Sequence, residues 1–278
     1  MNKFCAAAAS LLLIFLANIS CSINAVNVLD YAAKGDGKTI DNEALNFIGC
    51  NGVSVSNITS EDSPQVHMSV YQSNNTDIGF VNIKAPEDSP NTDGIHIQNS
   101  QDVRVHNSDI GTGDDCVSVG DQTRNINVTD VHCGPGHGVS VGSLGKDETT
   151  TVQVSHITVT NVNFTGTTNG ARIKTWAGRG VQLEDVIFAE AKGTSASEVA
   201  IKLDCSEFVP CTNIVLDTIT LTSAISEKQL ISNRNHAQGH LKNTVLPNSS
   251  AYLVTSILHS SVAADAIAHI HQHKHFEL

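Results

Sequence analysis

The sequence predicts an all-β protein built as a parallel β-helix, a solenoid in which each coil of chain stacks on the one before. A short strand-like phrase recurs seven times at steps of 23 to 33 residues. The segments between the phrases show no helical pattern, and aromatic residues make up only 4% of the chain. The phrases start at Val53, Ile78, Val103, Ile126, Ile157, Val181 and Ile214.

Apolar and polar residues alternate within each phrase, so its apolar side chains share one face of a strand. Asn or Asp follows at a fixed offset, where a turn is needed. One such unit cannot bury its apolar face alone, whereas a stack of units can. A leucine-rich repeat competes by period but its Leu and Asn framework is missing, and a β-sandwich would not give near-equal register. The solenoid is therefore expected over about residues 50–225.

The two ends of the chain differ from the repeats. Residues 26–49 contain Lys34-Gly-Asp-Gly and then a short helix expected from Asp41, which together would cap the open end of the solenoid. Residues 226–278 lose the repeat and hold seven of the 13 histidines, which predicts an irregular His-rich tail. Four alternating histidines near its end would share a strand face and could bind a metal, and an incidental extension is the other interpretation.

Residues 1–25 are expected to be a cleaved signal peptide, so the protein should be secreted. Lys3 precedes an apolar run too short for a membrane span, and small or polar residues follow up to Ala25. Removing this segment leaves five of the seven cysteines, an odd number, so one would be unpaired. The chain also carries N-glycosylation sequons, which fit export, at Asn57, Asn74, Asn127, Asn163 and Asn248.

Charge and composition exclude some classes of partner. Acidic residues outnumber basic ones 28 to 16, which gives a formal net charge of −12. A surface this negative argues against nucleic acid and against anionic membrane lipid as partners. The 278 residues are 40% hydrophobic and only 16% charged, which suits a folded domain with a substantial core. We expect a monomer.

Polar phrases interrupt the repeat at matching places in successive coils. Asp93, Asp115 and His137 are separated by 22 and 22 residues, one coil each time. Residues at equal offsets in a solenoid stack on strands about 4.8 Å apart, so these side chains should line one stripe of the surface. Asp114 lies in the same coil as Asp115. Because Asp115 shares the strand parity of the inward-facing Val117, a turn or bulge must redirect it.

Three carboxylates this close cannot all ionise easily, so at least one should keep a proton at mildly acidic pH. A carboxylic acid beside an ionised carboxylate is what hydrolysis of a glycosidic bond requires. Arg172 and Lys174 flank the inward-facing Ile173 and would place two cations near the same groove, which suggests a negatively charged substrate. Taken singly, the Asp-Asp motif also fits a plain turn or a Ca²⁺ site.

Together these phrases resemble the signature set of plant polygalacturonases, glycoside hydrolase family 28. They read Asn91-Thr-Asp-Gly-Ile-His, Gly113-Asp-Asp-Cys-Val-Ser, Cys133-Gly-Pro-Gly-His-Gly and Arg172-Ile-Lys-Thr-Trp. The resemblance implies a right-handed parallel β-helix that cleaves α-1,4-linked galacturonan in pectin of the cell wall, with inversion at the anomeric carbon. It implies no metal and no organic cofactor.

The same resemblance implies roles for the acidic stripe. Asp114 matches the general acid, and Asp93 and Asp115 match the pair that activates water. His137 matches the histidine that supports the acid. A pectate lyase is the alternative enzyme class on a similar solenoid, and it would need Ca²⁺ and an arginine base.

Arg172 and Lys174 match the cations that hold the substrate carboxylate, and Asn91 matches a polar neighbour of the site. A rhamnogalacturonan hydrolase is a close alternative that Arg172-Ile-Lys disfavours. The phrase Ile201-Lys-Leu-Asp-Cys-Ser is more similar to the exo-acting pollen type than to endo-acting relatives.

The resemblance also implies a pattern of disulfides. Cys116 and Cys133 match a pair that brackets the active-site coils in relatives. Cys205 and Cys211 look like a second, local pair. This pairing leaves Cys50 free.

The chain departs from a typical relative in ways that bear on activity. A relative carries further coils where Leu45 joins Asn46 directly here, and a stretch with a substrate-side tyrosine is missing near Ala191 to Gly193. The His-rich tail replaces the C-terminal coils. Deleting part of a coil would leave unpaired backbone groups, so a truncated chain with weak folding or impaired activity is expected. A pectin-binding remnant without turnover is the non-enzyme alternative.

Overall fold

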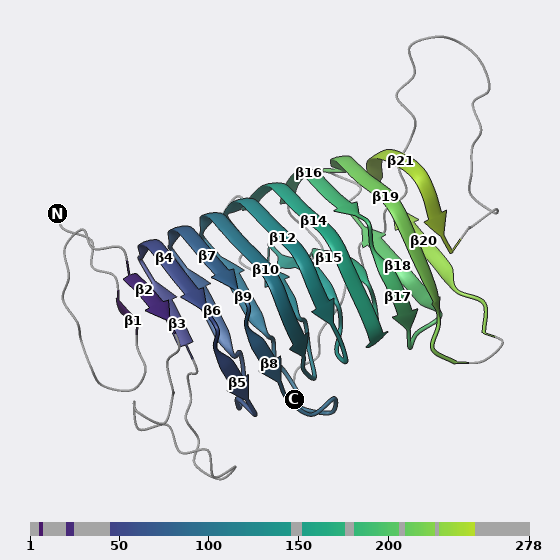
Figure 1. Cartoon of the computed structure of the whole chain (residues 1–278). Helices are drawn as coiled ribbons and strands as arrows, with labels where there is room; N and C mark the ends of the chain where they lie inside the picture. Colours follow the sequence, from purple (N-terminus) through teal and green to yellow (C-terminus); the bar gives the residue numbers. More distant parts are fainter. Residues whose placement is uncertain are drawn as a thin grey trace.

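The computed structural model describes residues 6–7, 21–24, 45–145, 152–175, 181–205, 209–225 and 228–247. In this part of the chain the regular elements are all strands, and they stack coil on coil along one axis (Figure 1). The predicted all-β parallel β-helix is therefore confirmed. The described residues include no helix of the length and apolar character needed to cross a membrane.

Two sheets, called sheet A and sheet B below, run along the solenoid. Sheet A orders its described strands as β1 (Ala6–Ala7), β3 (Leu45–Ile48), β6 (Met68–Tyr71), β9 (Ile95–Gln98), β11 (Val117–Val119), β13 (Val139–Leu144), β15 (Ala171–Thr175), β18 (Val199–Asp204) and β20 (Ile231–Asn235). Its neighbours pair in parallel, except that β1 and β3 are antiparallel.

Sheet B supplies the opposite wall, and its strands also pair in parallel. Its described strands are β2 (Cys21–Asn24), β4 (Asn51–Ser56), β5 (Thr59–Glu61), β7 (Asn74–Gly79), β8 (Asn82–Lys84), β10 (Gln101–Gly111), β12 (Thr123–Cys133), β14 (Val152–Thr167), β16 (Val181–Ala189), β17 (Lys192–Ser195), β19 (Cys211–Ser223) and β21 (Ala237–Leu246). Every coil thus presents one strand or more to each sheet.

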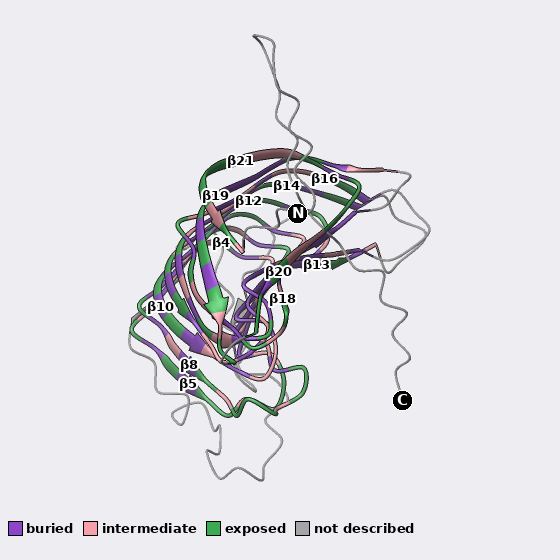
Figure 2. Ribbon diagram, turned by 90° about the vertical axis from the view of Figure 1, so that its right-hand side faces the viewer, coloured by how far each residue is buried: buried purple, intermediate pink, exposed green. Residues whose placement is uncertain are grey.

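The core lies between the sheets, and buried residues alternate with exposed ones along many of the strands (Figure 2). In sheet B one buried row runs through consecutive coils by way of Val103, Ile126, Ile157, Val186 and Ile214. Burying one such aliphatic side chain contributes roughly 1.5–3 kcal/mol. Because each coil repeats these contacts, the stack stabilises strands that would not persist singly.

Two of the repeated phrases enter the ladder in a register that differs from the prediction. Thr76, rather than Ile78, pairs with Val53. On a later coil Val186, rather than Val181, continues the same row. Thr76 is a polar residue at a buried position, so an apolar pattern alone could not identify this rung.

The strand ladder extends beyond both ends of the predicted solenoid, residues 50 and 225. β3 precedes it, and β20 and β21 follow and pair with β18 and β19. Most residues of β20 and β21 are exposed or half-buried, so this coil lacks the alternation that marks the earlier ones. Several predicted features lie outside the described residues. They are the rest of the predicted leader (residues 1–5, 8–20 and 25), the segment 26–44 with the helix expected from Asp41, and residues 248–278 of the His-rich tail.

The two places where coils were expected to be missing lie within paired strands. Leu45 and Asn46 both belong to β3, which pairs with β6 through these two residues. Lys192 and Gly193 belong to β17, which pairs with β14 and with β19. The backbone ladder therefore continues across both junctions. Weak folding or impaired activity stays a prediction. Its proposed cause, a strand ladder broken where part of a coil is missing, is not found at these four positions.

The cysteines form covalent links within the solenoid. Cys116 is bonded to Cys133, and Cys205 is bonded to Cys211. Cys50 is also disulfide-bonded, so the prediction that it stays free is wrong. That prediction counted only the cysteines after residue 25.

His67 is a buried titratable residue on the coil before the acidic stripe. Its ring is fully buried, its Nδ1 shares a 2.8 Å hydrogen bond with Ser60 Oγ, and its Nε2 has no hydrogen-bond partner. Burial lowers the pKa of His67 from 6.5 to about 4. Between these two pH values the unfolded chain binds a proton that the native state excludes. The free energy of unfolding should therefore rise with pH across this window.

We expect His67→Gln to flatten this rise, which amounts to at most roughly 3 kcal/mol. Urea unfolding at several pH values between 4 and 7 measures it. The same substitution at the exposed His132 is the matched control and should leave the slope unchanged. A slope that is identical in the wild type and in His67→Gln would contradict the assignment.

Candidate active site

The acidic stripe lies at the edge of sheet A, where three neighbouring strands are in register. Ile95 of β9 pairs with Val117 of β11, which pairs with Val139 of β13. Three residues predicted for the site each precede these paired positions by two: Asp93, Asp115 and His137. The 22-residue spacing therefore corresponds to one coil, and the three residues occupy equivalent positions on successive coils.

The outward-facing row of sheet A beside this stripe is polar throughout. It runs in register through His96, Ser118, Ser140, Arg172 and Lys202. The residues on either side of Ser118 and Ser140 are buried valines of the core. This row therefore supplies hydroxyl groups and cations to the carboxylates that precede each strand.

Asp115 is the most enclosed carboxylate, with 4% of its side chain exposed. It lies in the turn before β11, which begins at Val117, so strand parity does not apply to it. Its oxygens accept hydrogen bonds from Ser140 Oγ at 2.6 Å, Arg172 Nη2 at 2.5 Å and Lys174 Nζ at 3.3 Å. Burial alone would raise the pKa of Asp115, but the two cations and the Ser140 hydroxyl hold it below its usual value.

Asp114, the residue before Asp115, is the more exposed of the two adjacent carboxylates, with 22% of its side chain accessible to solvent. Its Oδ1 lies 2.8 Å from His137 Nδ1 and 4.0 Å from Arg172 Nη2. The backbone N–H of His137 also donates to the carbonyl oxygen of Asp114 at 2.8 Å. Two contacts to the next coil thus fix where this carboxyl group points.

Asp93 faces the same cluster from the preceding coil. Ser118 Oγ donates to Asp93 Oδ2 at 2.5 Å, and His96 Nδ1 lies 2.7 Å from that hydroxyl oxygen. Burial and then the charge of Asp115, with a smaller contribution from Asp114, raise the pKa of Asp93 to about 7, against the Ser118 hydrogen bond. In the protein without substrate, Asp93 therefore keeps its proton at mildly acidic pH.

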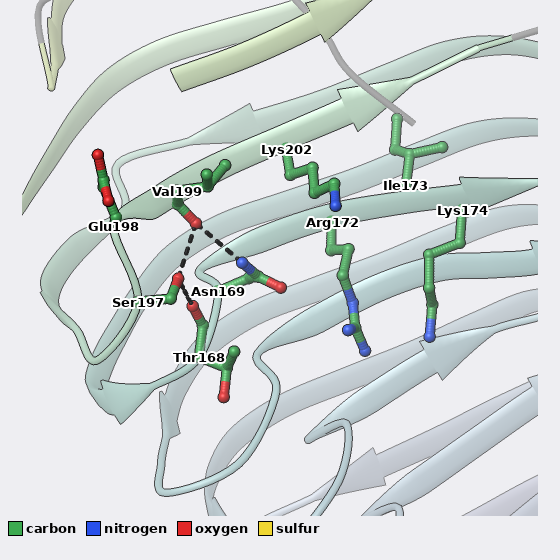
Figure 3. A pocket seen from close by; sticks show the side chains of 9 residues that line it. All are labelled: Thr168, Asn169, Arg172, Ile173, Lys174, Ser197, Glu198, Val199 and Lys202. Atoms are coloured by element: carbon green, nitrogen blue, oxygen red, sulfur yellow. Dashed lines mark hydrogen bonds between the residues drawn. The ribbon is translucent and has the colours of Figure 1, made fainter. Parts of the chain in front are cut away.

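The cations come from β15, where Arg172 and Lys174 extend in the same direction (Figure 3). Ile173 between them is fully buried, so the alternation of the strand places both cations on the outer face. Asn91 makes no contact of this kind with the cluster. Its side chain is exposed and makes no hydrogen bond to another described residue.

Sequence reasoning missed the polar residues that hold the cluster. Ser118 and Ser140 are the middle residues of two Val-Ser-Val phrases, each immediately after an active-site motif. The alternation of side chains along a strand could have identified them, because a residue between two core valines must face the groove. His96 and Lys202 belong to the same row and could be found only from the register of the sheet.

Ligand atoms of Asp114, Asp115 and His137 lie within 4.8 Å of one another, a geometry that could hold a cation. Both oxygens of Asp115 already accept hydrogen bonds from positively charged or hydroxyl donors. A metal would have to displace Lys174 or compete with Arg172. The donor set therefore fits an acid–base cluster better than a Ca²⁺ site, which requires free oxygen ligands.

Known proteins resemble this chain over most of the solenoid. It is 36% identical to a polygalacturonase of Malus domestica over 66% of this chain and 48% of that protein. It is 37% identical to a polygalacturonase of Prunus persica over 74% of this chain and 62% of that protein. The chain therefore spans about half the length of the curated relatives it matches.

Solved structures share the fold at lower identity. An endo-xylogalacturonan hydrolase from Aspergillus tubingensis superposes with a TM-score of 0.59 at 23% identity, over 69% of this chain and 58% of that one. A hyperthermoactive exopolygalacturonase from Thermotoga maritima gives a TM-score of 0.54 at 17% identity, over 71% of this chain and 53% of that one. The sequence model of glycosyl hydrolases family 28 matches residues 29–180 and 178–240. These matches and the register of the acidic stripe agree: the chain belongs to glycosyl hydrolases family 28.

Proposed function

We propose that this protein hydrolyses α-1,4-galacturonosyl linkages in pectin, with inversion at the anomeric carbon. The observation that carries the proposal is the cluster of three carboxyl groups from adjacent coils, in which Asp93 keeps a proton because of its burial and the charge of Asp115 while Asp115 stays ionised. Paired cations on the neighbouring strand give the same cluster an affinity for acidic sugars. The polygalacturonases that share its sequence support the choice of substrate.

Asp114 serves as the general acid. It is the more exposed carboxyl group of the adjacent pair, so it can reach the oxygen of a bound glycosidic bond. It protonates that oxygen as the bond to the anomeric carbon breaks. His137, hydrogen-bonded to Asp114 Oδ1, positions the carboxyl group and stabilises the carboxylate that remains.

Asp93 and Asp115 activate the attacking water as a pair. Asp115 is kept ionised by Arg172, Lys174 and the Ser140 hydroxyl, so it accepts the proton of the water while it also fixes the two cations in place. Asp93, which keeps its own proton at mildly acidic pH, faces the water from the preceding coil and orients it. The water oxygen joins the anomeric carbon on the face opposite the departing sugar, so both products carry hydroxyl groups and no double bond forms.

Arg172 and Lys174 bind the carboxylate of a galacturonate unit beside the bond that is cleaved. They carry two positive charges against the single charge of Asp115, which leaves an excess positive charge for the substrate. This local excess stands out in a chain of formal net charge −12. It selects an acidic polysaccharide over a neutral one.

We further propose that the protein is secreted to the cell wall as a monomer. The apolar leader over residues 1–25 supports export. The disulfides Cys116–Cys133 and Cys205–Cys211 support an oxidising compartment.

The direct test is product analysis after incubating the full chain with polygalacturonate. Hydrolysis predicts new reducing ends without ultraviolet absorbance, and the first product should carry the inverted anomeric configuration by NMR. Absorbing unsaturated uronides would instead identify a lyase. Saturable binding of polygalacturonate with no rise in reducing ends would identify a binding remnant, and either result would overturn the proposal.

A further inference from the structure

A cavity of about 320 Å³ adjoins the carboxylate cluster, because Arg172 and Lys174, which contact Asp115, also line the cavity. Figure 3 shows the side chains that line it. The cavity walls are β15, the start of β18 and the turns that precede these strands. Three basic side chains line it, Arg172, Lys174 and Lys202, and the acidic residue among its lining is the exposed Glu198. The cavity is therefore positively charged.

Lys202 differs from the other two cations because none of the described residues is its anionic partner. Arg172 and Lys174 both pair with Asp115, whereas no described carboxylate lies within 4.0 Å of the Lys202 amine. Burial lowers the pKa of Lys202, with Asp204 opposing and Arg172 reinforcing the effect. A partly desolvated ammonium group beside a guanidinium group gains strongly from a carboxylate supplied by a ligand.

The cavity walls are tied together by hydrogen bonds across the two turns. Asn169 Nδ2 donates to the carbonyl oxygen of Val199 at 2.9 Å, and Ser197 Oγ donates to the carbonyl oxygen of Thr168 at 2.5 Å. The Asn169 Oδ1 accepts no hydrogen bond from a described residue, so it can accept one from a sugar hydroxyl. The cavity thus offers a fixed acceptor together with a cation that no described carboxylate pairs with.

We propose that this cavity is a uronate subsite, in which Lys202 binds the carboxylate of a sugar next to the one held by Arg172 and Lys174. Arg172 and Lys202 are partners in register on neighbouring strands, about 4.8 Å apart along the solenoid axis. The two positions therefore lie side by side along the groove and suit two acidic sugars of one chain. The proposal rests on the proposed function and specifies which substrate carboxylate one further residue recognises.

The test measures binding of trigalacturonate by calorimetry to the full chain carrying Asp114→Asn, so that the ligand is not consumed. Lys202→Met should weaken binding about tenfold, and Lys202→Arg should restore most of the affinity. The fully methyl-esterified trimer should bind Lys202→Met and its parent equally, because it has no carboxylate. Lys192→Met removes an exposed lysine of β17, on sheet B, and should change neither affinity.

Equal affinity of Lys202→Met and its parent for trigalacturonate would overturn the proposal, as would an equal loss for both trimers. Turnover is measured separately, by reducing ends released by the chain with Asp114 intact. Absence of turnover with a Lys202-dependent affinity would reject the hydrolase and keep the subsite. Normal turnover without that dependence would reject the subsite and keep the hydrolase.

Discussion

Replacing Asp115 by Asn should destabilise the protein by about 3 kcal/mol and abolish hydrolysis. The substitution leaves Arg172 and Lys174 facing each other without the carboxylate that both contact. Because Asp115 is almost fully buried, water cannot replace the lost charge. Chemical unfolding at pH 7 measures the stability change, and reducing-end release measures the activity.

Asp109→Asn is the matched control, because Asp109 is an exposed aspartate on sheet B with 72% of its side chain accessible. It should change stability by less than about 0.5 kcal/mol. Adding Lys174→Met to Asp115→Asn should recover part of the lost stability, since it removes one of the two repelling cations. A loss below about 1 kcal/mol in Asp115→Asn, or strict additivity in the double variant, would contradict the ion-pair account.

Replacing Asp93 by Asn should stabilise the protein at alkaline pH while eliminating activity. The folded-state pKa of Asp93 is about 7, raised from 3.8. Between these values the native state holds a proton that the unfolded chain has lost, so its stability falls as pH rises and levels off above pH 7. The amide cannot ionise, so the advantage of Asp93→Asn should grow from pH 4 to pH 8, to at most roughly 4 kcal/mol.

Unfolding of Asp93→Asn and the wild type at pH 4.5, 6 and 8 tests this dependence. Asp109→Asn again serves as the control, and its difference from the wild type should be the same at all three values. A stability difference between Asp93→Asn and the wild type that does not depend on pH would refute the raised pKa. His67 produces the opposite slope over part of the same range, so the two effects partly cancel in the wild type.

The fold could be predicted because each coil repeats the same requirement. A row of apolar residues must continue from coil to coil, and the phrases at Val103, Ile126 and Ile157 show it in the correct register. The phrase at Ile78 gave the wrong register, because the position that pairs with Val53 is occupied by the polar Thr76. The last coil was missed for a related reason, since β20 and β21 are largely solvent-exposed.

The acidic stripe could be located because Asp93, Asp115 and His137 are separated by single coils of equal length. The pKa values of these groups could not be predicted, because they depend on contacts between coils of unequal length. Asp115 contacts Arg172 and Lys174 from two coils away. Neither the burial of Asp115 nor the assignment of the raised pKa to Asp93 follows from spacing.

We propose that carboxyl groups from adjacent coils act as one acid–base unit on a galacturonan chain. The test compares the reducing ends that the wild-type chain and Asp114→Asn release from polygalacturonate at pH 5. We predict steady release by the wild type and a loss of at least about 10³-fold in kcat for Asp114→Asn, with KM nearly unchanged. Equal rates for the two proteins would contradict the claim, and so would the absence of release by a wild-type chain that unfolds cooperatively.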